Sequence, residues 1–235
     1  MDKYTATNGA TFRSIRDPYC VFCHYPQDPT LGYRRCRTCN TLITHENIPL
    51  NYEMARSSTL YLSDQPNSET KFILRGKSSV PTCGVLAEAI ENRIRKEFPG
   101  MLLSQAVVPV PMSASKLASR GFNHAEAIAK DLARRLEFPI ADLLQVVREP
   151  PQSQHNLRLS QRLHNVEGCY AVKLPSSGSL PRVVLLVDNL YTTGATAIEC
   201  SKVLRNAGVL RVMVATAGRA VMKSDLGYLG AYVDA

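Results

Sequence analysis

A short apolar run that leads into a loop of small and hydroxylated residues constrains the fold of this chain more than any other feature. Residues 184–187 read Val-Leu-Leu-Val, which is too short for a helix and apolar enough for a strand buried on both faces. Residues 197–204 then predict a helix that ends near Gly208, and residues 212–216 predict the next strand. Strands that alternate with helices are typical of a parallel sheet covered on both faces, so we expect an α/β fold.

The loop between this strand and this helix has the composition of an anion-binding site. Its residues are small, hydroxylated or aromatic: Tyr191, Thr192, Thr193, Gly194, Ala195 and Thr196. Backbone N–H groups and the positive end of the helix dipole point into such a loop, and glycine lets the backbone approach a ligand. Asp188 and Asn189 end the strand beside it. The pattern predicts a phosphate-binding loop; the alternative is an ordinary turn that Asp188 caps.

A second predicted strand ends in a loop that carries two cations. Residues 106–110 are apolar, and residues 111–121 follow them with Lys116 and Arg120. Ligands of open α/β sheets bind at the carboxyl ends of the strands, where cations can take a phosphate or pyrophosphate. We therefore expect Lys116 and Arg120 to face the phosphate-binding loop, against the alternative that they are ordinary surface cations.

Two amphipathic helices are expected to cover the sheet. Each has one apolar stripe: Leu86, Ile90, Ile94 and Phe98 in the first helix, and Ala125, Ile128, Leu132 and Leu136 in the second. Pro99 and Gly100 are a stop signal for the first helix. We expect residues 47–70 to be polar and irregular, and residues 148–165 to form a polar segment with few apolar anchors.

The cysteines fall into two classes. Two C-x-x-C pairs, Cys20 with Cys23 and Cys36 with Cys39, are separated by twelve residues. This spacing lets four thiolates face one tetrahedral ion and predicts a structural Zn²⁺. Disulfides are the alternative, which a reducing compartment disfavours. The remaining cysteines are expected to be small buried hydrophobic residues: Cys83, Cys169 and Cys200.

Length and charge set the domain organisation and the class of partner. With 235 residues there is room for one α/β domain and a small appendage. We expect a flexible leader at 1–18, a four-cysteine zinc knuckle at 19–46 and the main domain at 47–235. No apolar run is long enough for a membrane span and no signal-peptide core is present, so we expect a cytoplasmic protein.

The net charge of +8 favours polyanionic partners without separating a nucleotide-like substrate from nucleic acid. Three arginines surround the second cysteine pair: Arg34, Arg35 and Arg37. They make nucleic-acid contact by the knuckle a second hypothesis, although no aromatic residues are interleaved with them as stacking platforms.

The segment from Val184 to Thr196 resembles the phosphoribosyl pyrophosphate (PRPP) signature of type I phosphoribosyltransferases, which is four apolar residues, two acids and a loop of Thr, Gly and Ser. The resemblance implies that Thr192–Thr196 hold the ribose 5-phosphate and that Asp188 and its neighbour hold the ribose hydroxyls. The second acid of the signature is Asn189 here. An amide still hydrogen-bonds a hydroxyl, but it has no charge to favour a metal or a developing cation.

Over most of its length, from Cys20 to Gly218, the chain resembles the ComF family, competence-associated proteins with a cysteine knuckle ahead of a phosphoribosyltransferase domain. The resemblance rests on four motifs in order: Arg120–Glu126, Gln154-x-x-Leu157, Arg162-x-x-Asn165 and the PRPP signature. His124 stands where the family usually has Gln, and Ala118 stands at a commonly cationic place.

The ComF resemblance implies a PRPP-dependent glycosyltransferase that moves a phosphoribosyl group to a nitrogenous acceptor and releases pyrophosphate. By it, Asp188 stabilises positive charge at the reacting carbon, Lys116 and Arg120 take the pyrophosphate, and Mg²⁺ accompanies PRPP. Residues 148–165 correspond to a mobile hood from which Arg162 reaches the pyrophosphate. The alternative, which Asn189 favours, is a catalytically weak PRPP- or nucleic-acid-binding protein that assists single-stranded DNA import together with other competence proteins.

Overall fold

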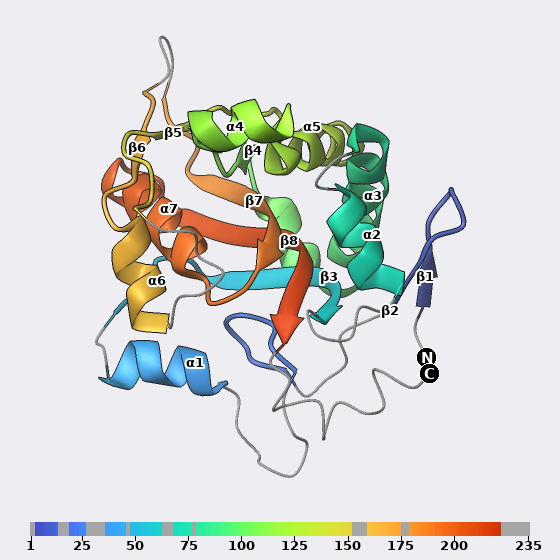
Figure 1. Cartoon of the computed structure of the whole chain (residues 1–235), viewed down its shortest axis with the longest axis horizontal. Coiled ribbons are helices and arrows are strands. Elements are labelled where there is room, and N and C mark those ends of the chain that lie inside the picture. Colours follow the sequence, from blue (N-terminus) through green and yellow to red (C-terminus); the bar gives the residue numbers. More distant parts are fainter. Residues whose placement is uncertain are drawn as a thin grey trace.

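A four-stranded parallel sheet forms the centre of the protein (Figure 1). The computed structural model describes residues 3–13, 19–26, 36–45, 48–62, 68–76, 79–151, 159–174 and 179–221. The strands of the sheet are β3 (Met54–Leu62), β4 (Ala106–Pro109), β7 (Val183–Tyr191) and β8 (Arg211–Val221). Their order is β3-β8-β7-β4, and every pairing is parallel. The predicted α/β class is confirmed.

The two strands predicted from apolar runs lie next to each other. Residues 106–109 of β4 pair with residues 184–187 of β7, and all eight residues are buried. β7 then continues to Tyr191, four residues beyond the predicted end, because β8 pairs with it as far as Arg219. Asp188 and Asn189 consequently lie within a strand.

Helices cover both faces of the sheet. On one face, Leu185 and Val187 pack against α3 (Val80–Glu97) and α5 (His124–Leu136). On the other face, Val184 and Leu186 pack with α7 (Ala195–Asn206) and the cysteine segment. Both predicted apolar stripes are buried, as is each of the three cysteines expected in the interior.

Each of the two amphipathic helices begins at a capping side chain. The Oγ of Ser79 accepts a hydrogen bond from the N–H of Thr82 at the start of α3. At the start of α5, Oδ1 of Asn123 accepts from the N–H of Ala125 (3.0 Å), while its Nδ2 donates to the carbonyl of Val110 (3.0 Å). Asn123 therefore fixes the start of α5 against the residue that follows β4.

Residues 47–70, expected to be irregular, contain β3 and the beginning of α2 (Ser68–Gly76). The strand escaped prediction because its buried positions include Ser57 and Ser58. The Ser57 hydroxyl pairs with that of Thr216 (2.7 Å) and Ser58 donates to Ala217 (2.5 Å), so β8 satisfies both groups.

The outer edge of β3 is covered by the cysteine segment. The N–H of Ala55 donates to the carbonyl of Phe22 (2.7 Å), and the N–H of Ser57 donates to Nδ1 of His24 (3.2 Å). At the opposite edge of the sheet, residues 139–141 exchange two backbone hydrogen bonds with Val107 of β4. Both edges of the sheet thus find partners within the chain.

The segment expected to be a flexible leader contains a hairpin of β1 (Lys3–Thr5) and β2 (Thr11–Arg13). Ala6 at the start of its turn is buried against the α3 core. Thr7 donates to Glu88 of α3 from its N–H (2.9 Å) and its hydroxyl (2.8 Å). Residues 3–13 are therefore folded against the main domain, and residues 14–18 lie outside the described ranges.

The remaining elements are short. They are α1 (Arg37–Asn40), a π-helical turn at Thr41–His45, a 3-10 helix at Pro99–Leu103, α4 (Ala114–Arg120), β5 (Leu144–Val146), α6 (Leu159–Val166) and β6 (Tyr170–Val172). β5 and β6 pair antiparallel. α4 occupies the segment expected to be a loop, and none of its residues is buried. Of the helices described, none is long and apolar enough to cross a bilayer.

The packing of α5 on the sheet predicts that replacing a leucine of α5 lowers the stability of the protein more than replacing a leucine of α4. Leu132 of α5 is fully buried, whereas Leu117 of α4 is 43% exposed. We expect Leu132→Ala to lower the free energy of unfolding by about 2–5 kcal/mol, because it removes buried methyl groups and leaves a cavity. Leu117→Ala should change it by less than about 0.5 kcal/mol. Urea unfolding measures both, and equal losses would contradict the described core.

Candidate functional site

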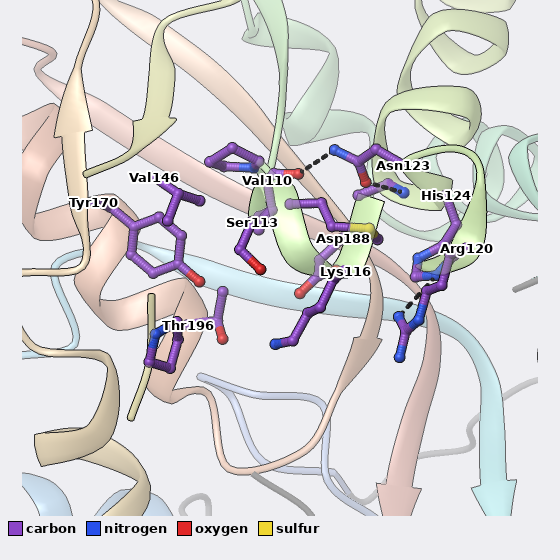
Figure 2. A pocket seen from close by; sticks show the side chains of 14 residues that line it. Val110, Ser113, Lys116, Arg120, Asn123, His124, Val146, Tyr170, Asp188 and Thr196 are labelled. Atoms are coloured by element: carbon purple, nitrogen blue, oxygen red, sulfur yellow. Dashed lines mark hydrogen bonds between the residues drawn. The ribbon is translucent and has the colours of Figure 1, made fainter. Parts of the chain in front are cut away.

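A cavity of about 150 Å³ lies where β4 and β7 reach the same edge of the sheet (Figure 2). Lys116 and Arg120 of α4 line it together with Asp188 of β7 and Thr196 of α7. The structure thus brings four of the predicted site residues around one cavity, although they come from three elements distant in sequence. Parallel strands explain this, because the loops that follow β4 and β7 leave the sheet on the same side.

The predicted phosphate-binding loop lines a second, smaller cavity of about 20 Å³ beside the first. The two share Val110, Asp188 and Thr196. Gly194 is the residue before α7 and has φ of 87°, a left-handed conformation in which a side chain would also collide with the Tyr191 hydroxyl. Glycine is therefore required at this turn.

Asp188 and Asn189 occupy different environments. Asp188 lines both cavities, and one of its carboxylate oxygens accepts a hydrogen bond from the N–H of Asn189 (2.7 Å). Asn189 is only 3% exposed and lines neither cavity. Its Oδ1 is buried with no hydrogen-bond partner among the described residues. Successive strand residues face opposite sides of a sheet, so the structure separates the two side chains that were expected to share the ribose hydroxyls.

Helix α4 is held by neighbours at both of its ends. Nη1 of Arg120 lies 3.0 Å from Nε2 of His124, and because a guanidinium only donates, this ring nitrogen is the acceptor. At the other end of α4, Glu149 accepts from the N–H (3.0 Å) and the hydroxyl (2.6 Å) of Ser115. These hydrogen bonds lower the pKa of Glu149. Both contacts orient an otherwise exposed helix toward the cavity.

Tyr170 of β6 is a lining residue that the sequence did not reveal (Figure 2). Burial raises its pKa, so its hydroxyl stays protonated near neutral pH, and it is within hydrogen-bonding reach of Thr196. No sequence motif marks this position, because β6 is placed by tertiary contacts, its pairing with β5 and its packing against α7. Ser113 and His124 line the cavity as well and were likewise not assigned to it.

Of the predicted binding residues only Thr196 lines the main cavity. The smaller cavity is lined by Tyr191, Thr192, Gly194, Ala195 and Thr196. Thr193 lines neither. Tyr191 is 3% exposed, and its hydroxyl pairs with that of Tyr52 on the side of the cysteine cluster. Arg162 of α6 is not among the described residues that line either cavity. The motif residues Gln154 and Leu157 lie outside the described residues. Of the expected hood, the structure describes residues 148–151 and 159–165.

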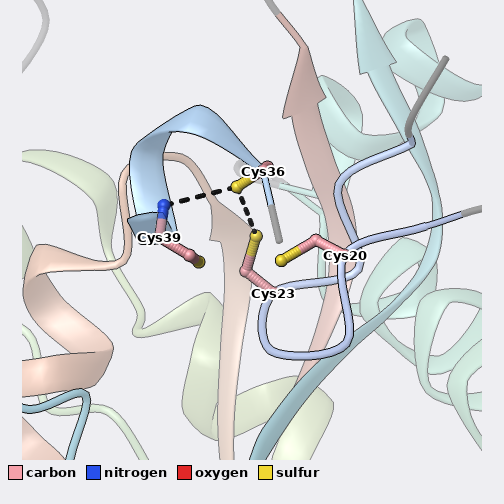
Figure 3. Close-up of side chains that lie close together, drawn as sticks. All are labelled: Cys20, Cys23, Cys36 and Cys39. Carbon is pink, nitrogen blue, oxygen red and sulfur yellow. Dashed lines mark hydrogen bonds between the residues drawn. The ribbon is translucent and has the colours of Figure 1, made fainter. Parts of the chain in front are cut away.

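The four paired cysteines converge on one buried point (Figure 3). Their sulfur atoms all lie within 4.8 Å of one another, and the Cys23 and Cys36 sulfurs are 3.5 Å apart. Zn–S bonds of about 2.3 Å in a tetrahedron place sulfurs roughly 3.8 Å apart, so the donor set fits a zinc ion. All four are free thiols in the structure, which is the arrangement for metal binding and not for disulfides.

Cys23 is polarised for metal binding by its surroundings. Burial opposes its ionisation, but hydrogen bonds from the other three cysteines and the charge of Arg219 lower its pKa well below the usual value. A thiolate is the form that coordinates a metal. The pKa of Cys20 is also lowered, to about 7: its hydrogen bond with Cys23 opposes ionisation, but those with Cys36 and Cys39 favour it. Two of the four positions are thus shifted toward the ligand state.

Comparison with known proteins gives several relatives and no matching family model. Competence protein F of Haemophilus influenzae is 30% identical over 122 residues, which are 52% of this chain and 53% of that protein. Competence protein ComFC of Bacillus subtilis is 25% identical over 196 residues, 83% of this chain and 75% of that protein. The DNA utilization protein YhgH of Escherichia coli is 28% identical over 115 residues, 49% of each chain. The chain thus spans about half the length of two of these relatives.

The cysteine cluster predicts that each chain binds one zinc ion and that removing one of the four thiols abolishes this binding. We expect about one Zn²⁺ per wild-type chain, and loss of that zinc during dialysis of Cys36→Ser, since structural sites use four ligands. Cys83→Ala is the matched control because Cys83 is equally buried but lies in the α3 core. Elemental analysis of the dialysed proteins measures the metal. Full zinc retention by Cys36→Ser would contradict the assigned ligand set.

Proposed function

Because the chain belongs to the ComF family, we propose that it binds PRPP in the cavity between α4 and the 192–196 loop and transfers its phosphoribosyl group to a nitrogenous acceptor. The observation that carries the proposal is the shared lining of the two cavities. Asp188 and Thr196 belong to both, so the phosphate-binding loop and the cations of α4 border one continuous site. A sugar with phosphates at both ends matches such a site.

The 5-phosphate would sit in the loop before α7. This helix has twelve residues, so its dipole and first N–H groups favour an anion at its start. The hydroxyls of Thr192 and Thr196 line the smaller cavity and add donors. This anchor is remote from the reacting carbon, so its binding energy positions the ribose for reaction.

Asp188 would hold the ribose and stabilise positive charge that develops when the bond to pyrophosphate breaks. Among the described residues that line the main cavity it is the only acid. Mg²⁺ is typically bound through one or two carboxylates together with substrate phosphates, so Asp188 fits as its protein ligand. When bound with PRPP, this ion would neutralise charge on the leaving pyrophosphate.

Lys116 and Arg120 would receive the pyrophosphate as the bond from the ribose carbon to oxygen breaks and the bond to the acceptor nitrogen forms. Arg120 is suited to bidentate phosphate contact. Its hydrogen bond to His124 supports this role, because it orients the guanidinium without neutralising it. His124 thus gives Arg120 a hydrogen-bond acceptor, which the glutamine usual at this position in the ComF family could also supply.

The proposal predicts that PRPP affinity depends on Asp188. We expect Asp188→Asn to weaken Mg²⁺-dependent binding by roughly 10- to 100-fold, the equivalent of about 1.5–3 kcal/mol for hydrogen bonds to a charged group. Isothermal titration calorimetry measures the binding. Asp142→Asn is the matched control, since Asp142 is 71% exposed, pairs with Lys173 and does not line the cavity. Unchanged affinity in Asp188→Asn would end the assignment of this site.

A second candidate function is single-stranded DNA binding with weak or no transfer activity. The relatives' names, Competence protein F and DNA utilization protein, and the net charge of +8 support it. The position of Asn189 supports it too, because only one carboxylate then faces the main cavity and transition-state stabilisation is reduced. In this reading the protein assists DNA uptake with partner proteins.

DNA binding through the knuckle would show in its salt dependence. If Arg34, Arg35 and Arg37 each contact a phosphate, replacing all three by Ala should reduce the slope of log affinity against log salt by about 2. Replacing Lys96, Lys130 and Arg134, which are exposed cations of α3 and α5, removes the same charge and should leave the slope closer to wild type. Fluorescence anisotropy with labelled oligonucleotide measures both. Equal slopes in the two triple variants would exclude the knuckle as the contact.

A further inference from the structure

Arg219 of β8 lies between the cysteine cluster and the phosphate-binding loop, and it is 1% exposed. On the cluster side, its Nε donates to the carbonyl of Cys23 (2.9 Å) and its Nη2 lies 3.4 Å from the Cys23 sulfur. On the loop side, its Nη1 donates to the carbonyls of Thr192 (2.6 Å) and Tyr191 (3.2 Å). One planar guanidinium therefore contacts a metal ligand and the loop at the same time.

Two tyrosine rings hold this guanidinium in place. Its central carbon lies 4.8 Å from the ring centroid of Tyr25 and 4.6 Å from that of Tyr191. The Tyr191 hydroxyl is paired with Tyr52 and lies against Gly194 of the loop. The arginine consequently has little freedom to exchange partners unless the cysteine segment or the loop moves.

The contact with Thr192 sets the direction of the following amide. A trans peptide is planar, so its C=O and N–H point in opposite directions. While Arg219 holds the carbonyl of Thr192, the N–H of Thr193 must point away from Arg219. Phosphate binding by a loop depends on the directions of such N–H groups.

The same guanidinium depends on the cysteine segment for its other partners. Small cysteine knuckles are ordered by their metal, because the ion supplies the folding energy that their core lacks. Four thiolates around one divalent ion also leave a net negative charge, which offsets the buried positive charge of Arg219. Loss of the ion would release Cys23 from its place and leave Arg219 to reorganise against the loop.

We propose that Arg219 is a positioning residue that couples zinc occupancy of the cysteine cluster to phosphate affinity at the 192–196 loop. The identity of the ligand, PRPP, rests on the proposed function; the coupling itself rests on the contacts of Arg219. Because coupling between two sites is reciprocal, zinc raises PRPP affinity and PRPP raises zinc affinity by the same factor. A tenfold effect is within the usual range of about 5- to 150-fold.

The test is the equilibrium competition for zinc between the protein and a chromogenic chelator, with and without saturating Mg²⁺ and PRPP. In the wild type we expect PRPP to raise the zinc affinity by about tenfold. Arg219→Lys keeps the charge but loses the planar fork, so the rise should fall below about twofold. Arg56→Lys is the control: Arg56 is partly buried and donates hydrogen bonds to the carbonyls of Val21, in the cysteine segment, and Ala55, neither of which belongs to the loop. An equal rise in zinc affinity in wild type and Arg219→Lys would overturn the proposal.

A second measurement separates this proposal from the proposed function and needs no variant. If calorimetry finds no PRPP binding to the wild type, the proposed function fails, and amide hydrogen exchange of zinc-loaded and chelated protein then tests the coupling alone. We expect chelation to speed exchange in residues 192–196 while residues 124–136 of α5 stay protected. Unchanged exchange in the loop would overturn the coupling. Loss of protection in α5 as well would also overturn it, because the metal would then support the whole fold.

Discussion

Parallel hydrogen bonding of β7 to both of its neighbours is the constraint on which the site depends. The register sets Pro109 of β4 opposite Val187 of β7, so the chain leaves β4 just as β7 presents Asp188. The cations that follow β4 and the carboxylate of β7 are thereby brought to one place. β8 extends β7 on its other side as far as Tyr191, which sets where the phosphate-binding loop begins. Strand pairing, more than any contact among the site residues, determines this geometry.

The cysteine segment supports the sheet from a different direction. Its buried residues join those of α7, β7 and β8 in a single core, so the cluster is continuous with the main domain on the face that carries the phosphate-binding loop. Arg219 connects the two with hydrogen bonds on both sides. An ion held by the four cysteines would add rigidity to this short segment beyond its apolar packing.

The sequence was sufficient where a structural signal is local. Apolar runs located β4 and the core of β7, four-residue spacing located the stripes of α3 and α5, and cysteine spacing located the cluster. It failed where stability comes from distant partners: β3 depends on β8 for its serines, and the N-terminal hairpin depends on Glu88. In the site, the motif pointed to Asp188 and the loop. That the side chain of Asn189 points away from both cavities follows only from its place in strand β7, where successive side chains face opposite sides of the sheet. Tyr170 reaches the cavity through tertiary pairing that leaves no mark in its neighbourhood.

The hydrogen bonds from Ala55 and Ser57 to the cysteine segment have a consequence for solubility. They occupy two N–H groups on the outer side of β3, which would otherwise be unpaired at this edge of the sheet. An open edge is a template on which a second chain can add a strand. If an ion held by the four cysteines keeps this cover in place, its loss would uncover β3 and favour self-association of the protein, so metal binding would also protect against aggregation.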